Sequence, residues 1–293
     1  MATRTAIVSI FLALLLGAVM TWAGSEGSYE RFGLPVFAWA SILIFAIQWV
    51  AFLLAWATHS ERFFDLTGSL TYLVAILLCL MMTDSPEPHS FLVATLVTVW
   101  ALRLGAFLSA RVRAAGSDSR FDAIKNSFFR FLFTWTMQGL WVLVAAGATL
   151  AAISRPERTP VGTLALVGCV IWAVGFGVEV VADEQKRRFR SAPQHRNSFI
   201  TTGLWGWSRH PNYAGEILLW FGISVAALPA LEGWGLLTLV SPVFVWVLLA
   251  RVSGIPLLEV AADRRWGDRA DYQSYKARTP VLFPRFSGTR HSG

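Results

Sequence analysis

Long apolar stretches recur along this chain, and they constrain its fold more than any other feature. A helix needs roughly 20 consecutive apolar residues to cross the hydrocarbon core of a bilayer. Segments near that length occur eight times, at 5–23, 35–58, 68–83, 89–108, 129–152, 160–182, 213–231 and 235–251. The sequence therefore predicts an all-α, polytopic transmembrane bundle of seven or eight helices. The lower number applies if the last two segments form a re-entrant hairpin.

The first apolar segment has a second interpretation. Arg4 precedes it and the small residues Ala23, Gly24 and Ser25 end it, as in a secretory signal peptide. The stretch is long for a signal peptide, and its removal would leave an odd number of spans. We therefore expect a membrane helix here.

Basic residues indicate the orientation of these helices, since Lys and Arg concentrate in cytoplasmic loops. With the N-terminus inside, only Arg31, Arg155 and Arg158 of the 25 basic residues fall on the outer side. Both termini are therefore predicted to be cytoplasmic, in a multi-pass protein of a bacterial inner membrane. The net charge of +7 follows from this topology and from attraction to membrane lipid, so nucleic acid is not an expected partner.

Sequence motifs for a soluble nucleotide domain or a metal site are missing. The chain has neither a GxGxxG nor a GxxxxGK[ST] fingerprint, so any nucleotide would have to bind among the helices. The five histidines are scattered, whereas a metal site needs clustered ligands. We expect no metal site.

Polar residues gather in three predicted cytoplasmic stretches, at 109–128, 183–212 and 251 to the C-terminus. Residues 287–293 are small and polar and are predicted to form a disordered tail. The middle stretch begins while the sixth span is still helical. Spacings of three and four there put five charged residues on one helix face: Glu179, Asp183, Lys186, Arg187 and Arg190. That face suits a phosphorylated, hydrogen-bonding ligand or simply lipid headgroups, and the composition favours neither.

The seventh span has a polar start. Proline suits the first turn of a helix, where its missing N–H costs nothing, so the helix is predicted to begin at Pro211. His210 then lies just outside the span, and Asn212, Tyr213 and Glu216 lie in its first turns. An ionised carboxylate at the start of a membrane helix costs free energy unless it is paired or faces a water-filled cavity. Glu216 is therefore either functional or an interfacial group paired with a nearby arginine.

Two earlier spans also contain polar groups. Arg103 in the fourth span and Gln138 in the fifth should point into the bundle, although Arg103 can also snorkel to the cytoplasmic edge. The third span is preceded by Asp65 and has Tyr72 near its start, among several hydroxyl residues. This is an unusually polar beginning for a short membrane helix.

Taken together, these motifs resemble the signature of the steroid 5-alpha-reductase superfamily. The closest resemblance is to its bacterial members of unknown function that carry the steroid 5-alpha-reductase C-terminal domain. The core is Thr202-Gly203-Leu204-Trp205 followed by Ser208-Arg209-His210-Pro211-Asn212-Tyr213 and Gly215-Glu216. Further matches lie at 100–105, 119–122, 136–141, 182–190, 253–259 and 272–284. The resemblance implies a reductase-like membrane domain at 59–286 with a cofactor cavity inside the membrane, after N-terminal helices at 1–58.

The resemblance also implies a function. The implied protein is an NADPH-dependent reductase of a conjugated C=C bond in a lipophilic substrate. The substrate would be steroid-like, isoprenoid or acyl, and it would enter from the membrane lipid. On the matching positions, Asn212 would hold the nicotinamide amide, Asp183 the ribose or adenine side, and Arg187 and Arg190 the phosphates. The other cofactor-binding residues that it implies are Arg103, Lys186, His210, Tyr213, Glu216, Glu259 and Tyr275.

The catalytic positions depart from the family pattern. In steroid 5-alpha-reductases a Glu and a later Tyr face the substrate carbonyl. By offset, the Glu position falls near Asp65 here and the Tyr position falls on Trp100. Indole cannot act as an acid, which argues against a 3-oxosteroid substrate. Asp65, kept protonated by desolvation, with Tyr72 about two helical turns on, is the substitute pair that the sequence offers.

Two other functions compete with this one. The RHPxY core, with its Glu and a C-terminal Tyr-x-x-Tyr, is shared with isoprenylcysteine and phospholipid methyltransferases. S-adenosylmethionine-dependent methylation of a lipid or isoprenoid is therefore the alternative. The basic face of Lys186, Arg187 and Arg190 favours NADPH, because a sulfonium cofactor has no phosphate. A lipid-binding or transport protein without catalysis is the third hypothesis, but the chain lacks the internal repeats of a transporter.

Overall fold

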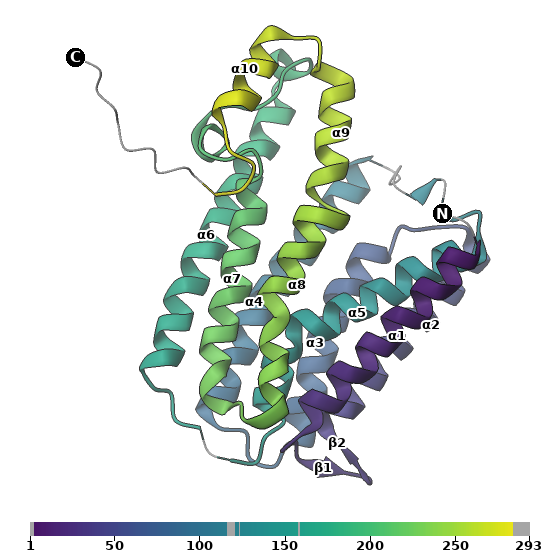
Figure 1. The fold of residues 1–293 in the computed structure, drawn as a ribbon, viewed down its shortest axis with the longest axis vertical. Helices are drawn as coiled ribbons and strands as arrows, with labels where there is room; N and C mark the ends of the chain where they lie inside the picture. The colour runs from purple at the N-terminus through teal and green to yellow at the C-terminus, as the bar shows by residue number, and fades with distance from the viewer. Residues whose placement is uncertain (1–2, 116–120, 123, 158, 284–293) are drawn as a thin grey trace. The chain divides into compact units, whose positions relative to one another are not determined.

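The computed structural model describes residues 3–115, 121–122, 124–157 and 159–283, and these residues are mostly helical. Among them are eight helices that are long and apolar enough to cross a membrane. The all-α, membrane-spanning fold class is thus confirmed (Figure 1). The sidedness of the termini and the domain boundaries stay predictions. The tail expected at 287–293 lies outside the described residues.

The chain divides into two compact units. Unit 1 comprises Met1–Cys169 and Ile223–Phe244, and unit 2 comprises Val170–Gly222 and Val245–Gly293. Because segments of the chain alternate between the units, neither unit is one continuous stretch of sequence.

Unit 1 is built around a central helix, α5 (Phe128–Ile153). It packs against α1 (Thr3–Ser25), α2 (Val36–Thr58), α3 (Phe64–Met82) and α4 (Pro88–Ala115). Of the most apolar stretch of α5, 83% is buried, against 22% to 56% for the other seven spans. Its second half is rich in alanine and glycine, which let neighbouring helices approach closely. A short antiparallel hairpin, β1 (Glu30–Arg31) and β2 (Leu34–Pro35), joins α1 to α2.

Unit 2 contains the core of the predicted signature, residues 202–216. It holds most of α6 (Thr163–Ser191) and the first turns of α7 (Pro211–Ala227). It then holds the end of α8 (Ser241–Val247), α9 (Ile255–Trp266) and α10 (Ala270–Arg278). The eighth span, predicted to end near 251, continues through a π-helical turn at Leu248–Val252 into α9. Pro256 in the first turn of α9 suits this new helix start.

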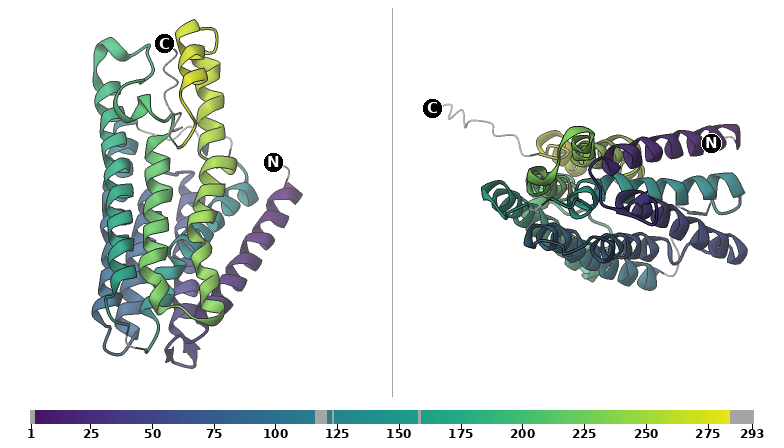
Figure 2. Two further views of the ribbon diagram at one scale, coloured as in Figure 1. Left: turned by 60° about the vertical axis from the view of Figure 1, so that its left-hand side comes forward. Right: turned by 90° about the horizontal axis from the view of Figure 1, so that it is seen from below.

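The first half of α7 lies directly against α6 (Figure 2). A Cβ atom on Gly215 would lie 2.6 Å from the carbonyl oxygen of Gly175 and 2.7 Å from the amide nitrogen of Glu179. A Cβ atom on Gly175 would lie 2.5 Å from the amide nitrogen of Leu219. Only glycine allows two backbones to approach this closely, so this pair fixes the contact between the two helices.

Candidate functional site

One face of α6 carries four of the predicted polar residues in a single row. Glu179, Asp183, Lys186 and Arg190 follow one another at spacings of four, three and four residues, and α6 stays helical through all of them. The two carboxylates are buried, whereas Lys186 is half-buried and Arg190 is exposed. At 1.5 Å per residue the row is about 16 Å long. The face therefore changes from hydrogen-bond acceptors to cations along its length.

The first turns of α7 lie beside the carboxylate end of this row. The helix begins at Pro211, as the sequence predicts, with His210 just outside it. Nδ2 of Asn212 donates a hydrogen bond to Oδ1 of Asp183 at 3.1 Å. Glu216 lies one turn further along α7 and is buried. The predicted residues Asp183, Asn212 and Glu216 thus gather where α6 and α7 touch.

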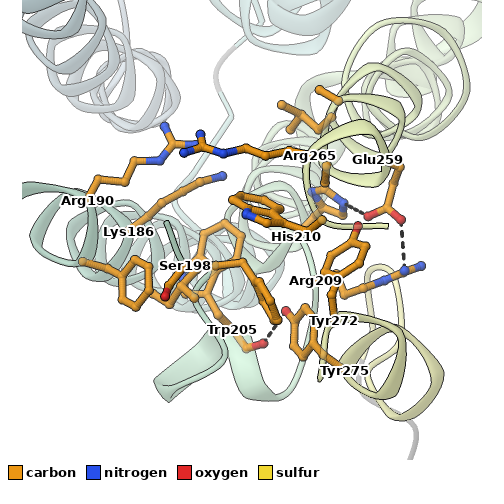
Figure 3. Close-up of a pocket in the computed structure, with 17 residues that line it drawn as sticks. Lys186, Arg190, Ser198, Trp205, Arg209, His210, Glu259, Arg265, Tyr272 and Tyr275 are labelled. Carbon is orange, nitrogen blue, oxygen red and sulfur yellow. Dashed lines mark hydrogen bonds and ion pairs between the residues drawn. The ribbon is translucent and has the colours of Figure 1, made fainter. Parts of the chain in front are cut away.

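A cavity of about 250 Å³ lies at the cation end of the row (Figure 3). Its walls come from α6, from the loop that leads into α7, and from α9 and α10. Of the predicted cofactor residues, five line it: Lys186, Arg190, His210, Glu259 and Tyr275. Besides Tyr275, five Phe, Trp and Tyr residues line it: Phe189, Phe199, Trp205, Trp266 and Tyr272. The cavity thus combines flat apolar walls with cations, which suits a nucleotide.

Glu259 organises one wall of this cavity. Its Oε2 lies 2.9 Å from Nη1 of Arg209, and its Oε1 lies 2.8 Å from Nε2 of His210. Burial lowers the pKa of His210 below the ordinary value, although Glu259 acts in the opposite direction. The imidazole is therefore neutral at neutral pH and donates its Nε2–H to the carboxylate. Its ring stacks on Tyr213, with centroids 5.8 Å apart.

The loop before α7 is held in place by Trp205. The indole N–H of Trp205 donates to the carbonyl of Ala182 at 3.0 Å, and Oη of Tyr275 donates to the carbonyl of Trp205 at 2.7 Å. Burial raises the pKa of Tyr275 to about 12, so the phenol keeps the proton that it donates. Gly203 has a φ of +61°, a left-handed conformation that favours glycine. The Gly and the Trp of the Thr-Gly-Leu-Trp motif thus have structural roles in this loop.

The segment after α10 holds the same loop from the C-terminal side. Backbone N–H groups of Arg209 and His210 donate to the carbonyls of Pro280 and Val281 at 2.9 and 3.1 Å. The hydroxyl of Ser208 donates to the carbonyl of Val281 at 3.2 Å. The backbone around Arg209 and His210 is therefore fixed independently of their side chains.

Arg187, predicted to bind phosphate, is not among the residues that line the cavity. Its side chain is 59% exposed, and Nε and Nη2 each lie 2.7 Å from an oxygen of Glu184. This pairing satisfies the guanidinium on the outer face of α6. The structure therefore gives no support to Arg187 as a phosphate ligand.

Several residues of the cavity wall were not selected from the sequence as site residues. They are Phe199, Trp205, Arg209, Arg265, Trp266 and Tyr272. Helical periodicity was the available signal for α9, because Leu258, Ala262 and Arg265 recur at four and seven residues and all line the cavity. Tyr272 precedes Tyr275 by one turn of α10 in the same way.

The remaining predicted residues, Asp65, Tyr72 and Arg103, belong to unit 1. Asp65 lies half-buried in the first turn of α3, and Tyr72 is 4% exposed. The Tyr72 ring packs edge to face on Trp100, with centroids 5.2 Å apart. Arg103 is half-buried on α4, with its guanidinium 5.2 Å from the centroid of the Phe107 ring.

Polar groups from α2 and α5 also reach the first turns of α3. Nε2 of Gln138 donates to the carbonyl of Phe64 at 3.1 Å, and Nε2 of Gln48 donates to Oγ1 of Thr71 at 2.9 Å. The predicted inward orientation of Gln138 agrees with this contact. The start of α3 is thus surrounded by polar side chains within the core of unit 1.

Comparison with known proteins gives a family match over most of the chain. The sequence profile of a family described as "Protein of unknown function (DUF1295)" matches residues 51–279. The uncharacterized protein C594.04c of Schizosaccharomyces pombe is 23% identical over 230 residues, which cover 68% of this chain and 64% of that protein. The probable O-methyltransferase ustE of Ustilaginoidea virens is 26% identical over 134 residues, 46% of this chain and 45% of that protein.

The chain thus spans less than two thirds of the length of either relative. No solved structure gives a significant match.

Proposed function

Because the chain belongs to the DUF1295 family, a steroid 5-alpha-reductase-like family of membrane proteins, we propose that it is an NADPH-dependent reductase. Its substrate would be a lipophilic molecule with a conjugated C=C bond. The family match alone supports only a reductase-like membrane protein. The argument for NADPH comes from unit 2.

The single observation that carries the proposal is the polar row on α6. A ligand that contacts the whole row must be elongated, since the row is about 16 Å long. It must meet carboxylates and an amide at one end, around Asp183 and Asn212, and cations at the other, around Lys186 and Arg190. A dinucleotide has these properties in this order, with amide and ribose hydroxyl donors at its nicotinamide end and phosphates beyond them.

The size of the cavity supports the same assignment. Sites that enclose a complete drug-sized ligand have volumes of roughly 300–1,000 Å³. A cavity of about 250 Å³ is therefore suited to one end of a dinucleotide. Aromatic walls and cations suit the adenosine end, because a purine stacks on flat rings and phosphates bind arginine and lysine.

In this proposal the chain's own residues bind, orient and protonate. NADPH supplies a hydride to the electron-poor carbon. Asn212 orients the nicotinamide amide, Asp183 orients the adjoining ribose, and Glu216 lies one turn further along α7. His210, Glu259 and Tyr275 form the wall of the adenosine end, and Lys186 and Arg190 bind phosphate. Asp65, with Tyr72 packed on Trp100, is the group in unit 1 that polarises the substrate carbonyl and provides a proton.

Methyl transfer from S-adenosylmethionine is the second candidate. It is favoured by the relative named as a probable O-methyltransferase and by the aromatic walls, which attract a sulfonium through cation–π interaction. It leaves most of the cations on the cavity walls unexplained, because this cofactor has one carboxylate and no phosphate. We therefore rank it below the reductase.

The proposal is tested by NADPH consumption in lipid vesicles that contain the purified protein, with a panel of lipophilic conjugated enones and their saturated counterparts. We expect oxidation of NADPH with at least one enone and with none of the saturated compounds. Methylation of a lipid acceptor from S-adenosylmethionine, with no NADPH oxidation across the panel, would overturn the proposal in favour of the second candidate.

A further inference from the structure

Residues 279–283, which follow α10 in unit 2, are held against the start of α7. The backbone N–H of His210 donates to the carbonyl of Val281 at 3.1 Å. His210 directly precedes Pro211, the first residue of the candidate membrane span Pro211–Ala230. In Figure 1 this yellow segment returns from α10 toward α7. Val281 is therefore fixed at the level where α7 enters a membrane.

Large apolar side chains are exposed at the same level, and we call Trp207, Val281 and Phe283 the apolar patch. Trp207 comes four residues before Pro211 and is 66% exposed, and Phe283 comes two residues after Val281 and is 54% exposed. Two residues of extended chain span at most about 7 Å, so Phe283 stays near the same level. Aromatic residues at the end of a membrane span are typical of the layer of lipid headgroups. The position of the patch therefore favours lipid as the partner that covers it.

The charges of the chain near the patch are positive. From residue 272 to the C-terminus the sequence has no Asp or Glu and four basic residues, Lys276, Arg278, Arg285 and Arg290. Nζ of Lys276 lies 2.6 Å from Oδ1 of Asp263, whereas Arg278, next to the segment 279–283, is exposed. Basic residues beside apolar side chains at a membrane surface attract anionic lipid. The charge thus complements an anionic bilayer.

We propose that residues 279–283 and Trp207 form a docking surface for an anionic lipid bilayer, with the apolar patch among the headgroups and Arg278 bound to their negative charge. The inference does not depend on the reductase proposal. It has a consequence for the cavity, because carbonyls of the same segment accept hydrogen bonds from the backbone of Arg209 and His210, which line it. Lipid bound to this surface thus stabilises one wall of the cavity.

The test is the accessibility of a nitroxide spin label on the full-length protein in lipid vesicles. The label is attached at Phe283→Cys or at Ser274→Cys, with Cys79→Ala and Cys169→Ala in both proteins. Ser274 is the control, because it is exposed on α10 and is not part of the patch. Collisions with oxygen, which concentrates in the bilayer, are compared with collisions with a water-soluble nickel complex. The vesicles contain phosphatidylcholine, alone or with an equal part of phosphatidylglycerol, and melting temperatures show whether each variant folds.

In the vesicles with phosphatidylglycerol we expect oxygen to reach the label at position 283 and the nickel complex to be excluded from it. The label at position 274 should behave in the opposite way. Adding Arg278→Gln should lower the ratio of membrane-bound to aqueous label at position 283 about fivefold, the contribution of one arginine near an anionic surface. The same change should have little effect in phosphatidylcholine alone, and raised salt should weaken the effect of phosphatidylglycerol.

Equal access of the nickel complex to the two labels would overturn the inference, because the patch would then face water. Shielding of position 283 from both reagents, in detergent as well as in vesicles, would also overturn it, since protein would then cover the patch. That protein would be another part of this chain or a second copy of it. An unchanged ratio after Arg278→Gln in the vesicles with phosphatidylglycerol would refute the role of anionic lipid.

Discussion

Oε1 of Glu259 lies 2.8 Å from Nε2 of His210, so a residue of α9 orients the imidazole that directly precedes α7. Arg209 contacts the other oxygen of the same carboxylate. Two neighbouring residues of the RHP motif therefore depend on one acidic residue, which lies 49 positions after His210 in the chain. Glu259 thus holds the side chains of both residues in position.

Replacing Glu259 with Gln should destabilise the protein. The change leaves the Arg209 guanidinium, whose side chain is only 13% exposed, without its charged partner. Loss of hydrogen bonds to a charged group costs about 1.5–3 kcal/mol. Thermal unfolding of the detergent-solubilised protein measures the effect. The control is Glu184→Gln, since Glu184 pairs with Arg187 and Arg188 on the exposed face of α6 and should matter little. Equal melting temperatures for the two variants would contradict the role of Glu259.

The free energy of unfolding should decrease as the pH falls below 6.5, the ordinary pKa of histidine. Burial lowers the pKa of His210 from 6.5, so below that pH the unfolded chain binds a proton that the folded protein binds only at lower pH. Folding stability therefore decreases as the pH falls from 6.5 toward the lowered pKa. Lys186 and Arg209 face the ring and oppose its protonation, while Glu259 favours it.

The measurement is melting temperature against pH for the wild type and His210→Gln. We expect the variant to show a flatter profile between pH 6.5 and the lower pKa. Parallel profiles in that range would contradict the assignment to His210.

Much of the fold was predictable because membrane spans obey a simple length rule. All eight segments predicted from hydropathy contain a helix in the structure, including the short third one. The continuation of the eighth span to Trp266 was not predicted, because charged residues such as Asp263 and Arg264 interrupt the apolar pattern. Local hydropathy cannot identify a polar helix that is held by packing and by side-chain contacts from α10.

The candidate site was predictable only in part. Motifs that are local in sequence were found, such as the row on α6 and the start of α7, because helical spacing places their side chains. Arg265 and Trp266 were missed, since their proximity to Lys186 and Arg190 depends on how distant helices pack. The pairing of Arg187 with Glu184 was also missed, although the three-residue spacing on one helix is a known signal.

The close contact between α6 and α7 should not tolerate a methyl group. Gly215→Ala places a Cβ atom 2.6 Å from the Gly175 carbonyl oxygen and 2.7 Å from the Glu179 amide nitrogen, so the helices must separate. Such overpacking costs about 1–3 kcal/mol. The control is Gly177→Ala on α6, where no atom lies within 4 Å of the new Cβ.

Because alanine is the better helix former, the Gly177 variant should be neutral or about 0.5–1 kcal/mol more stable. Thermal unfolding compares the two variants. A melting temperature for Gly215→Ala at or above that of Gly177→Ala would contradict the described contact.

Asp65→Asn should separate chemistry from cofactor binding. The amide cannot donate a proton to the substrate, so turnover should fall at least 100-fold, in the range expected for general acid catalysis. Binding of NADPH should stay within about twofold of the wild type, because the proposed cofactor residues that line the cavity belong to unit 2. Turnover and equilibrium binding are measured on the same preparation. Unchanged turnover would exclude Asp65 as the acid.

The most direct test of the central claim is thermal stabilisation of the detergent-purified protein by NADPH, NADH and S-adenosylmethionine, for the wild type and Asn212→Ala. A ligand that binds only the folded state raises the melting temperature, and at equal concentrations a ligand with a lower Kd raises it more. The account predicts the largest increase with NADPH, and its loss in Asn212→Ala, which removes the side chain that bonds Asp183 at 3.1 Å. An increase with S-adenosylmethionine and none with NADPH would contradict it.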